Sequence, residues 1–545
     1  MRQGYLALVL HAHLPFVRHP EDEHALEARW LYEAITETYV PLLKVFQRLR
    51  QDQVPFAITM SLTPPLVAML TDPWLQQSYL RHLEALRELA DKELVRTRGD
   101  SRFHHLAQMY YQLLEDTYRI YHETYSDNLV EAFRELQEAG NLEIIASAAT
   151  HAYLPLAYPH REAVWAQLAE GIKQYYRHFG RYPRGLWLPE CGYHPGDDQI
   201  MKQLGIKYFI LDAHGILYAT PRPRYANYAP IACPNSGVHA FGRDLESSKQ
   251  VWSAQEGYPG DPDYREFYRD IGYDLPYEYI GPYVHPSGIR TDTGFKYYRI
   301  TGRSNHKEPY EPAWADSKAA IHAGNFMFNR EKQIEWLASH MDRAPIVVSP
   351  YDAELFGHWW FEGPRWLDYL IRKVAYDQKV FSLITPSQYL ELYPHSQPSQ
   401  PCMSSWGYNG YNEVWLEGSN DWIYRHLHNI TKRMVYLAWR FPQSSGILRR
   451  ALNQAAREVL LAQASDWPFI MKTGTMVQYA RRRVILHVGR FLQLYQQILS
   501  GQIDAGWLDY LEAHDNLFPE LDYQVFAHPW TEEQPPVPVM AATTS

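Results

Sequence analysis

Cysteine is scarce in this chain of 545 residues, with Cys191, Cys233 and Cys402 as its three examples. Three scattered thiols are too few for a disulfide framework or for a zinc site built on cysteine. No stretch approaches the roughly 20 apolar residues that a membrane span requires. The start of the chain has no small-residue cleavage site of the kind that ends a secretory signal. We therefore expect a cytoplasmic protein in a reducing compartment, with no membrane partner.

An excess of basic charge is also lacking, because 52 Lys and Arg residues stand against 62 Asp and Glu residues, a formal net charge of −10. A nucleic-acid-binding protein normally carries a basic footprint, so we expect no nucleic-acid partner. The glycine-rich loops that bind dinucleotides or phosphates are missing, and so is a Gly-x-Ser-x-Gly motif. We expect no cofactor, and a monomer or a small homo-oligomer.

Aromatic residues are abundant, with 42 Tyr, 17 Trp and 20 Phe. Tyrosine and tryptophan offer a flat apolar face with a polar edge, which suits stacking on sugar rings. Many of these rings must belong to the core, so the composition favours a carbohydrate ligand without deciding the matter.

Short apolar runs, most of them continuous rather than alternating, predict strands of a parallel sheet that is covered on both faces. Helical patterns lie between several of them, which indicates a parallel α/β barrel or a doubly wound sheet. The eight candidate strands are residues 5–10, 56–60, 142–147, 185–188, 207–211, 238–242, 346–349 and 381–384.

Two regions interrupt this alternation. Residues 69–140 are charged and amphipathic, which predicts a helical insertion into a catalytic barrel of residues 1–68 and 141–400. Residues 401–530 have helical periodicity and predict a separate C-terminal domain. The tail, residues 531–545, is expected to be disordered.

Two strands are predicted to end in carboxylates. Gly185-Leu-Trp-Leu188 is followed by Pro189-Glu190, and Ile346-Val-Val-Ser349 by Pro350-Tyr351-Asp352. Strand ends are where α/β barrels place their chemistry, and two carboxylates among aromatic residues suit acid/base or nucleophilic catalysis on a sugar. The alternative is that these carboxylates cap helices or pair with arginine.

Histidines follow three of the predicted strands. His11 and His13 lie on one face at the end of the first strand, His151 follows the third, and Asp212 and His214 follow the fifth. These side chains can bind a metal ion or the hydroxyl groups of a substrate, and the residues alone leave both alternatives open.

Aromatic segments near the second carboxylate and at the predicted domain junction are candidate sugar platforms. His358 and Trp359 lie in a Gly- and Pro-bounded segment after Asp352. Trp406, Trp415 and Asp421 lie in the junction loop. Domain junctions are common ligand sites.

Taken together, these motifs resemble the five ordered sequence regions of glycoside hydrolase family 57. The five segments are His11-Ala-His-Leu-Pro15, Ile145–His151, Trp187-Leu-Pro-Glu190, Tyr351-Asp352 through Trp359, and residues 406–422. The resemblance extends from residue 5 to about residue 520. Within that family the chain is most similar to 1,4-α-glucan branching enzymes, through segments such as Phe241-Gly-Arg-Asp244 and Asn412-Glu-Val-Trp415.

The resemblance implies a distorted (β/α)7 barrel with a helical insertion and an all-helical C-terminal domain. It also implies a retaining mechanism without metal, in which Glu190 is the nucleophile and Asp352 the general acid/base. The substrate would be an α-glucan such as amylose, glycogen or a starch-like chain. The candidate substrate-binding residues are His11, His13, His151, Trp187, Asp212, His214, Arg243, His358, Trp359, Trp406, Trp415 and Asp421, with Tyr225 and Tyr228 as candidate loop residues over the site.

Three alternatives remain at this stage. The chain could be a 4-α-glucanotransferase or an α-amylase of the same family. It could be a metal-dependent deacetylase-like hydrolase that uses His11 and His13 with an aspartate as ligands. It could also be a catalytically silent glucan-binding protein, although the presence of both Glu190 and Asp352 argues against that.

Overall fold

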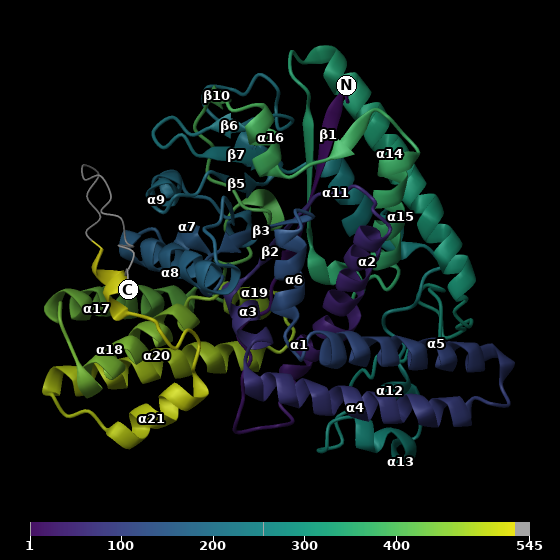
Figure 1. Ribbon diagram of the computed structural model, residues 1–545. Coiled ribbons are helices and arrows are strands. Elements are labelled where there is room, and N and C mark those ends of the chain that lie inside the picture. Colours follow the sequence, from purple (N-terminus) through teal and green to yellow (C-terminus); the bar gives the residue numbers. More distant parts are fainter. Residues whose placement is uncertain (1, 254–255, 529–545) are drawn as a thin grey trace. The chain divides into compact units, whose positions relative to one another are not determined.

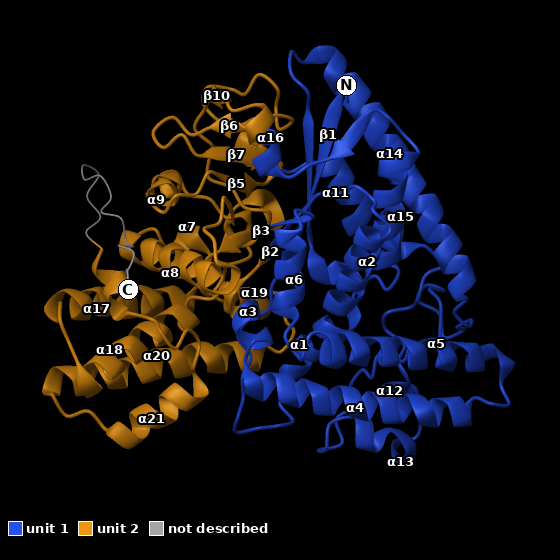
Figure 2. Cartoon of the chain, in the orientation of Figure 1, with its two compact units in different colours: residues 1–61, 66–144, 243–389 blue, residues 62–65, 145–242, 390–545 orange. Residues whose placement is uncertain are grey.

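The computed structural model describes residues 2–253 and 256–528, and the chain divides into two compact units (Figure 2). Unit 1 contains Met1–Ser61, Leu66–Ile144 and Arg243–Tyr389. Unit 2 contains Leu62–Pro65, Ile145–Gly242 and Leu390–Ser545. The expected tail, residues 531–545, lies outside the described residues.

The centre of unit 1 is a group of buried parallel strands (Figure 1). Strand β1 (Gly4–Ala12) lies between β2 (Ile58–Leu62) and β8 (Ile346–Asp352). Residues 6–10 of β1 are completely buried, as expected for a parallel strand that is covered on both faces. The register pairs His11 with Asp352, so two predicted site residues end neighbouring strands.

The outer edge of β8 is paired as well. Arg243 forms a parallel bridge with Val348 of β8, and the backbone N–H of Asp244 donates to the carbonyl of Val348 at 2.8 Å. Strand β9 (Phe381–Leu383) pairs with the start of β1, away from the main strand order. One of the eight predicted strands is therefore peripheral.

Unit 2 contains a second run of strands in the order β10, β6, β7, β5, β4 and β3. The parallel members are β3 (Leu142–Ser147), β4 (Gly185–Trp187), β5 (Tyr208–Leu211) and β7 (His239–Gly242). Strand β3 is shared, because its first three residues belong to unit 1. The two-residue strands β6 (Ile231–Ala232) and β10 (Gln397–Pro398) are too short to be recognised from hydrophobic periodicity.

The predicted insertion forms long helices in unit 1. Helix α4 (Pro73–Arg96) begins after Asp72, whose side chain accepts from the N–H of Leu75, and α5 (Ser101–Tyr118) is capped in the same way by Asp100. The two helices run side by side in Figure 1, and Arg87 of α4 forms two hydrogen bonds with Glu115 of α5. Helix α6 (Leu129–Glu138) leads into β3.

The C-terminal part of unit 2 is helical. Helix α18 (Gly446–Ala462) is its central element, since all its residues from 454 to 462 are buried. The others are α17 (Trp422–Arg440), α19 (Asp466–Thr473), α20 (Val477–Ser500) and α21 (Ala505–His514). Among the described residues, no helix combines the length and the apolar character that crossing a membrane requires.

The two compact units do not follow the predicted domain boundaries. The division between the units separates β1 and β8 from β4, β5 and β7. It places the C-terminal helices in the same unit as β4, β5 and β7. The domain boundaries predicted at residues 68, 140, 400 and 530 differ from this division and remain predictions.

Candidate active site

Glu190 has a backbone conformation that is unusual for its residue type. It follows β4 in a short 3₁₀ turn, Pro189–Cys191, and has φ of 62° and ψ of 22°, while Cys191 has φ of 50°. Left-handed conformations cost a non-glycine residue roughly 1–3 kcal/mol and concentrate at functional sites. The carbonyl of Glu190 accepts from the N–H of Trp406 at 3.0 Å, which helps to hold the turn.

Trp406 and Ser465 help to orient the carboxylate of Glu190. Trp406 Nε1 donates to Oε2 at 2.8 Å, and Ser465 Oγ lies 3.3 Å from Oε1. His151 Nδ1 is 4.0 Å from Oε1 and 2.8 Å from Ser465 Oγ. The Glu190 side chain is 17% exposed, so the carboxylate is held in place and remains accessible.

Two of the tryptophans predicted to bind substrate are buried, and the prediction is corrected for both. Trp187 is completely buried and packs edge-on against Trp406, with ring centroids 5.0 Å apart. Trp415 is 1% exposed and stacks on Tyr153 at 4.2 Å. Neither ring has a face that a sugar can reach, so the prediction that they bind substrate directly is wrong. Both rings instead pack around Trp406 and support its position.

Asp212 and His214 lie at the end of β5, as predicted. His214 Nε2 is 2.7 Å from the carbonyl of Gly410, and Nδ1 is 3.4 Å from Asp212 Oδ1. The hydrogen bond with Asp212 raises the pKa of His214. Both ring nitrogens are engaged in this way, so His214 fastens the loop that follows Trp406.

The remaining predicted residues of unit 2 lie near its surface. Asp421 precedes α17 and is exposed. Tyr225 and Tyr228 are half-buried and belong to one turn, in which the N–H of Tyr228 donates to the carbonyl of Tyr225 at 3.0 Å.

In unit 1, Asp352 ends β8 beside His11 of β1. His11 is 3% exposed, and its Nδ1 is 2.9 Å from Ser61 Oγ. Burial, and next the charge of His13, hold the pKa of His11 well below its ordinary value. The His11 imidazole beside the predicted general acid/base is therefore uncharged near neutral pH. Its ring stacks on that of His13, with centroids 5.8 Å apart.

Glu354 is a second carboxylate of this segment and lies two residues after Asp352. Its Oε1 accepts from the Tyr39 hydroxyl at 2.5 Å and from the backbone N–H of His13 at 3.2 Å. Burial raises the pKa of Glu354, and the bond from Tyr39 offsets part of that rise. These contacts assign Glu354 to holding His13 and Tyr39 in place.

The segment after Asp352 is fixed to the π-helical turn η1 (Ile35–Tyr39). His358 Nδ1 is 2.7 Å from Glu37 Oε2. Burial opposes both charges, but the attraction within the pair prevails, so the pKa of Glu37 is lowered and that of His358 is raised. Gly357 has φ of 114°, and a Cβ there would meet the Glu37 carbonyl oxygen at 1.7 Å. Glycine is therefore required at this contact.

Trp359 is the exposed aromatic residue of this segment. It is 56% exposed and stacks on Phe267 with ring centroids 4.6 Å apart. Its position allows it to serve as a sugar platform. Arg243, by contrast, donates from Nε to Ser248 Oγ at 2.9 Å, within the turn that begins α11 (Leu245–Trp252).

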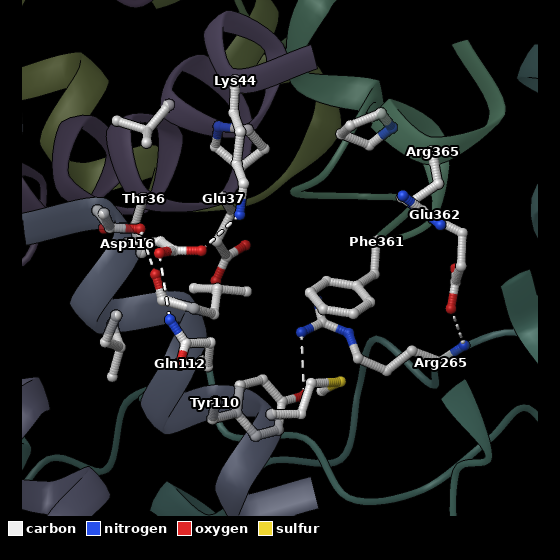
Figure 3. Close-up of a pocket in the computed structure, with 18 of the residues that line it drawn as sticks. Thr36, Glu37, Lys44, Tyr110, Gln112, Asp116, Arg265, Phe361, Glu362 and Arg365 are labelled. Carbon is white, nitrogen blue, oxygen red and sulfur yellow. Dashed lines mark hydrogen bonds and ion pairs between the residues drawn. The ribbon is translucent and has the colours of Figure 1, made fainter. Parts of the chain in front are cut away.

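A cavity of about 700 Å³ in unit 1 has Glu37 among its lining residues (Figure 3). Apolar side chains and rings such as Tyr110 and Phe361 line it. Charged groups in its lining are paired, for example Lys44 with Asp116 at 2.5 Å. Neither Asp352 nor Glu354 lines it, so this cavity is separate from the predicted acid/base residues.

A buried cluster of Glu458, His487 and Asp515 has potential ligand atoms within 4.8 Å of one another. Its atoms are already engaged, because His487 Nδ1 is 2.7 Å from Glu458 Oε2, His487 Nε2 accepts from Arg483 Nε, and Asp515 pairs with Arg490. The cluster is an internal network of hydrogen bonds and ion pairs rather than a vacant coordination site.

Comparison with known proteins identifies the family. The model of glycosyl hydrolase family 57 matches residues 7–400, which is more than half of the chain. The chain belongs to glycosyl hydrolase family 57. A second model, the C-terminal region of 1,4-alpha-glucan branching enzyme, matches residues 426–526 of this family 57 protein.

Similar proteins cover nearly the whole of this family 57 chain. The 1,4-alpha-glucan branching enzyme TK1436 of Thermococcus kodakarensis is 32% identical over 98% of this chain and 79% of its own length. The crystal structure of the α-amylase AmyC from Thermotoga maritima is 47% identical, with a TM-score of 0.91 over 97% of this chain and all of that one. The family 57 branching enzyme of Pyrococcus horikoshii is 32% identical, with a TM-score of 0.86 over 98% of each chain.

These likenesses confirm the predicted fold class of this family 57 protein, a curled parallel α/β sheet with helices and a helical C-terminal part. Sequence reasoning missed Glu37, Phe267 and Ser465, which contact the predicted site residues His358, Trp359 and Glu190. It also missed Tyr39, which contacts Glu354. Ser465-Asp466-Trp467-Pro468 indicates a helix start, and nothing in that pattern indicates a neighbour of Glu190.

Proposed function

We propose that this family 57 protein is a 1,4-α-glucan branching enzyme. The observation that carries the proposal is the match of residues 426–526 to the C-terminal region of such enzymes. The full-length similarity to TK1436 supports it. The expected substrate is an α-glucan, and the expected product carries new α-1,6 branches.

The proposed chemistry is retaining. Glu190 attacks the anomeric carbon and forms a covalent glycosyl-enzyme, while Asp352 protonates the departing 4-oxygen. In the second step Asp352 takes the proton from a 6-hydroxyl group of an acceptor chain, whose oxygen attacks the anomeric carbon and releases Glu190. A direct displacement of this kind requires the two carboxyl groups to lie about 5–5.5 Å apart during the reaction.

The contacts of each carboxylate support these roles. Glu190 is ready to act as a nucleophile because Trp406 and Ser465 orient it. Asp352 ends a buried strand beside an uncharged histidine. Trp359, which exposes much of its ring, is proposed as an aromatic platform for glucan.

An α-amylase is the second candidate, because the AmyC structure is named as one and is 47% identical to this chain. The two activities share the glycosyl-enzyme and differ in what attacks it. Water gives hydrolysis, whereas a 6-hydroxyl group gives a branch. Transfer therefore depends on holding the acceptor and excluding water.

One experiment separates the candidates. Purified protein is incubated with amylose, α-1,6 linkages are measured by proton NMR, and reducing ends are measured in the same samples. A branching enzyme forms α-1,6 signals with few new reducing ends. Reducing ends without α-1,6 signals would establish the amylase, and redistributed linear chains would establish a 4-α-glucanotransferase.

A cytoplasmic location is proposed on the thiols. Within the described residues Cys191, Cys233 and Cys402 form no disulfide, and the first two are buried. Free thiols persist in a reducing compartment.

A further inference from the structure

Ser465 lies between a histidine and the predicted nucleophile. Its Oγ is 2.8 Å from His151 Nδ1 and 3.3 Å from Glu190 Oε1. Both Ser465 and His151 are buried, with exposures of 1% and 2%. The three side chains belong to unit 2, although Ser465 is more than 270 positions after Glu190 in the sequence.

The available protons determine the direction of these hydrogen bonds. An ionised carboxylate can only accept, and a serine hydroxyl has one proton to donate. Ser465 therefore donates to Glu190, which obliges His151 to donate from Nδ1 to Ser465. Trp406 Nε1 can only donate, and it does so to the other carboxylate oxygen. The arrangement is a chain of donors that ends on the nucleophile.

Backbone contacts hold Ser465 in this position. Its N–H donates to the carbonyl of His151 at 3.0 Å, and Ala464 forms an antiparallel bridge with Ala152. Ser465 is also the residue that precedes α19. The helical C-terminal part of the chain therefore contributes a hydroxyl group beside Glu190.

We propose that Ser465, aligned by His151, is a positioning residue that fixes the orientation and favours the ionised state of the nucleophile Glu190. This inference rests on the proposed function. Attack forms the bond from Glu190 to the anomeric carbon, breaks the bond to the 4-oxygen, and transfers the proton of Asp352 to that oxygen. The glycosyl ester is a weaker acceptor than the carboxylate, so Ser465 also favours release of Glu190 in the second step.

The test is Ser465→Ala with amylose. Loss of a hydrogen bond to a charged group predicts a decrease in kcat of about 10- to 100-fold, with KM changed less than threefold. The acidic limb of the kcat/KM profile should move to higher pH, because a carboxylate that loses a donor is protonated more easily. Ser465→Thr, which keeps the hydroxyl group, should restore most of both effects.

Other groups near Glu190 are the same in each variant. Tyr153 is one such titratable side chain, since burial, as the larger cause, and the Glu190 charge both raise its pKa. Asp466 is another, because its carboxylate has an oxygen within 4.8 Å of a ring nitrogen of His151. Ser444→Ala is the matched control, since Ser444 Oγ bonds the Tyr523 hydroxyl at 2.9 Å within the same helical part. It should leave the acidic limb unchanged.

A second pair of variants is informative even if Ser465→Ala does not fold. His151 has φ of 56°, a conformation that asparagine tolerates, and the amide of His151→Asn can replace the Nδ1 donor. His151→Asn should therefore shift the acidic limb less than His151→Ala. Equal shifts in this pair, or an unshifted limb in folded Ser465→Ala, would overturn the inference. An active Glu190→Gln would instead overturn the proposed function.

Discussion

Glu190 combines a strained backbone with a fixed carboxylate. Glu190→Gln removes the nucleophile and should lower turnover of amylose by more than about 1,000-fold, with an unchanged far-UV circular dichroism spectrum. Glu190→Gly should be equally inactive and more thermally stable than Glu190→Gln, by on the order of 1 kcal/mol, because glycine adopts a φ of 62° without strain. Turnover near the wild-type rate in either variant would contradict the assignment.

The two neighbouring acids of unit 1 should behave differently. Asp352→Asn should be inactive on glucan, and partly rescued on an aryl maltooligoside, whose leaving group needs no proton. Glu354→Gln should keep part of its activity on glucan and show no such rescue, because Glu354 contacts Tyr39 and the His13 backbone. The reverse pattern would make Glu354 the general acid/base.

For individual residues, the sequence predicts which carboxylates end strands, because an apolar run followed by Pro-Glu or Pro-Tyr-Asp is visible in the chain. It cannot predict that Ser465 meets Glu190 or that Tyr39 meets Glu354. Those contacts join residues separated by 275 and 315 positions, and their local sequences indicate only a helix start and a helical residue.

At the level of helices, strands and loops, a buried tryptophan and an exposed one can be compared for their effect on stability. Trp415→Ala removes a completely packed ring and should lower the free energy of unfolding by about 3–5 kcal/mol. Trp359→Ala removes an exposed ring and should change stability by less than about 0.5 kcal/mol. Thermal unfolding of both variants tests the difference, and equal losses of stability would show that Trp359 is also a packing residue.

Trp359→Ala should also change the outcome of the reaction. If the ring holds glucan, its loss should raise the number of reducing ends released for each α-1,6 linkage formed. The same comparison applies to deletion within the turn of Tyr225 and Tyr228, the candidate loop over the site, because a loop that covers the site would exclude water. A constant ratio with a lower overall rate would assign these groups to structural support alone.

The helical C-terminal part should respond to acid through His487. Burial, as the main cause, lowers the pKa of His487 to about 3, whereas an unfolded histidine titrates near 6.5. The folded state therefore binds fewer protons, so this contribution to stability is complete above about pH 6.5 and is lost as the pH falls towards 3, by up to about 1.4 kcal/mol per unit. The Tm should decrease between pH 7 and pH 5.

His487→Gln should make that decrease in Tm smaller. His306→Gln, at an exposed loop position, is the control and should leave it unchanged. A decrease of the same size in His487→Gln and in the parent protein would exclude His487 as the source.

Strands with continuous apolar sequence, such as β1 and β8, can be predicted because burial on both faces dictates their composition. The burial of Trp415 cannot, since its loop contains Gly and Asn turn residues and the ring is covered by Tyr153 from a distant segment. Loop character indicates a connection between elements, but it does not show which way a side chain points.

For the whole molecule, the retaining mechanism predicts that activity is independent of metal ions. Dialysis against EDTA should leave the rate of α-1,6 bond formation unchanged, because no proposed step uses a Lewis acid. Elemental analysis of the same sample provides the comparison. Stoichiometric zinc, with activity lost on its removal and restored on its return, would favour the deacetylase-like alternative.

The interleaving of the two units has a consequence during biosynthesis. Strand β1 ends at Ala12, but its partner β8 begins at Ile346 and belongs to the same unit. At ordinary elongation rates the ribosome needs on the order of tens of seconds to reach β8. Throughout that interval one edge of a strand whose central residues 6–10 are all apolar remains without its partner, so efficient expression should depend on chaperones that bind nascent chains. Truncation before β8 should yield aggregated fragments rather than a folded half.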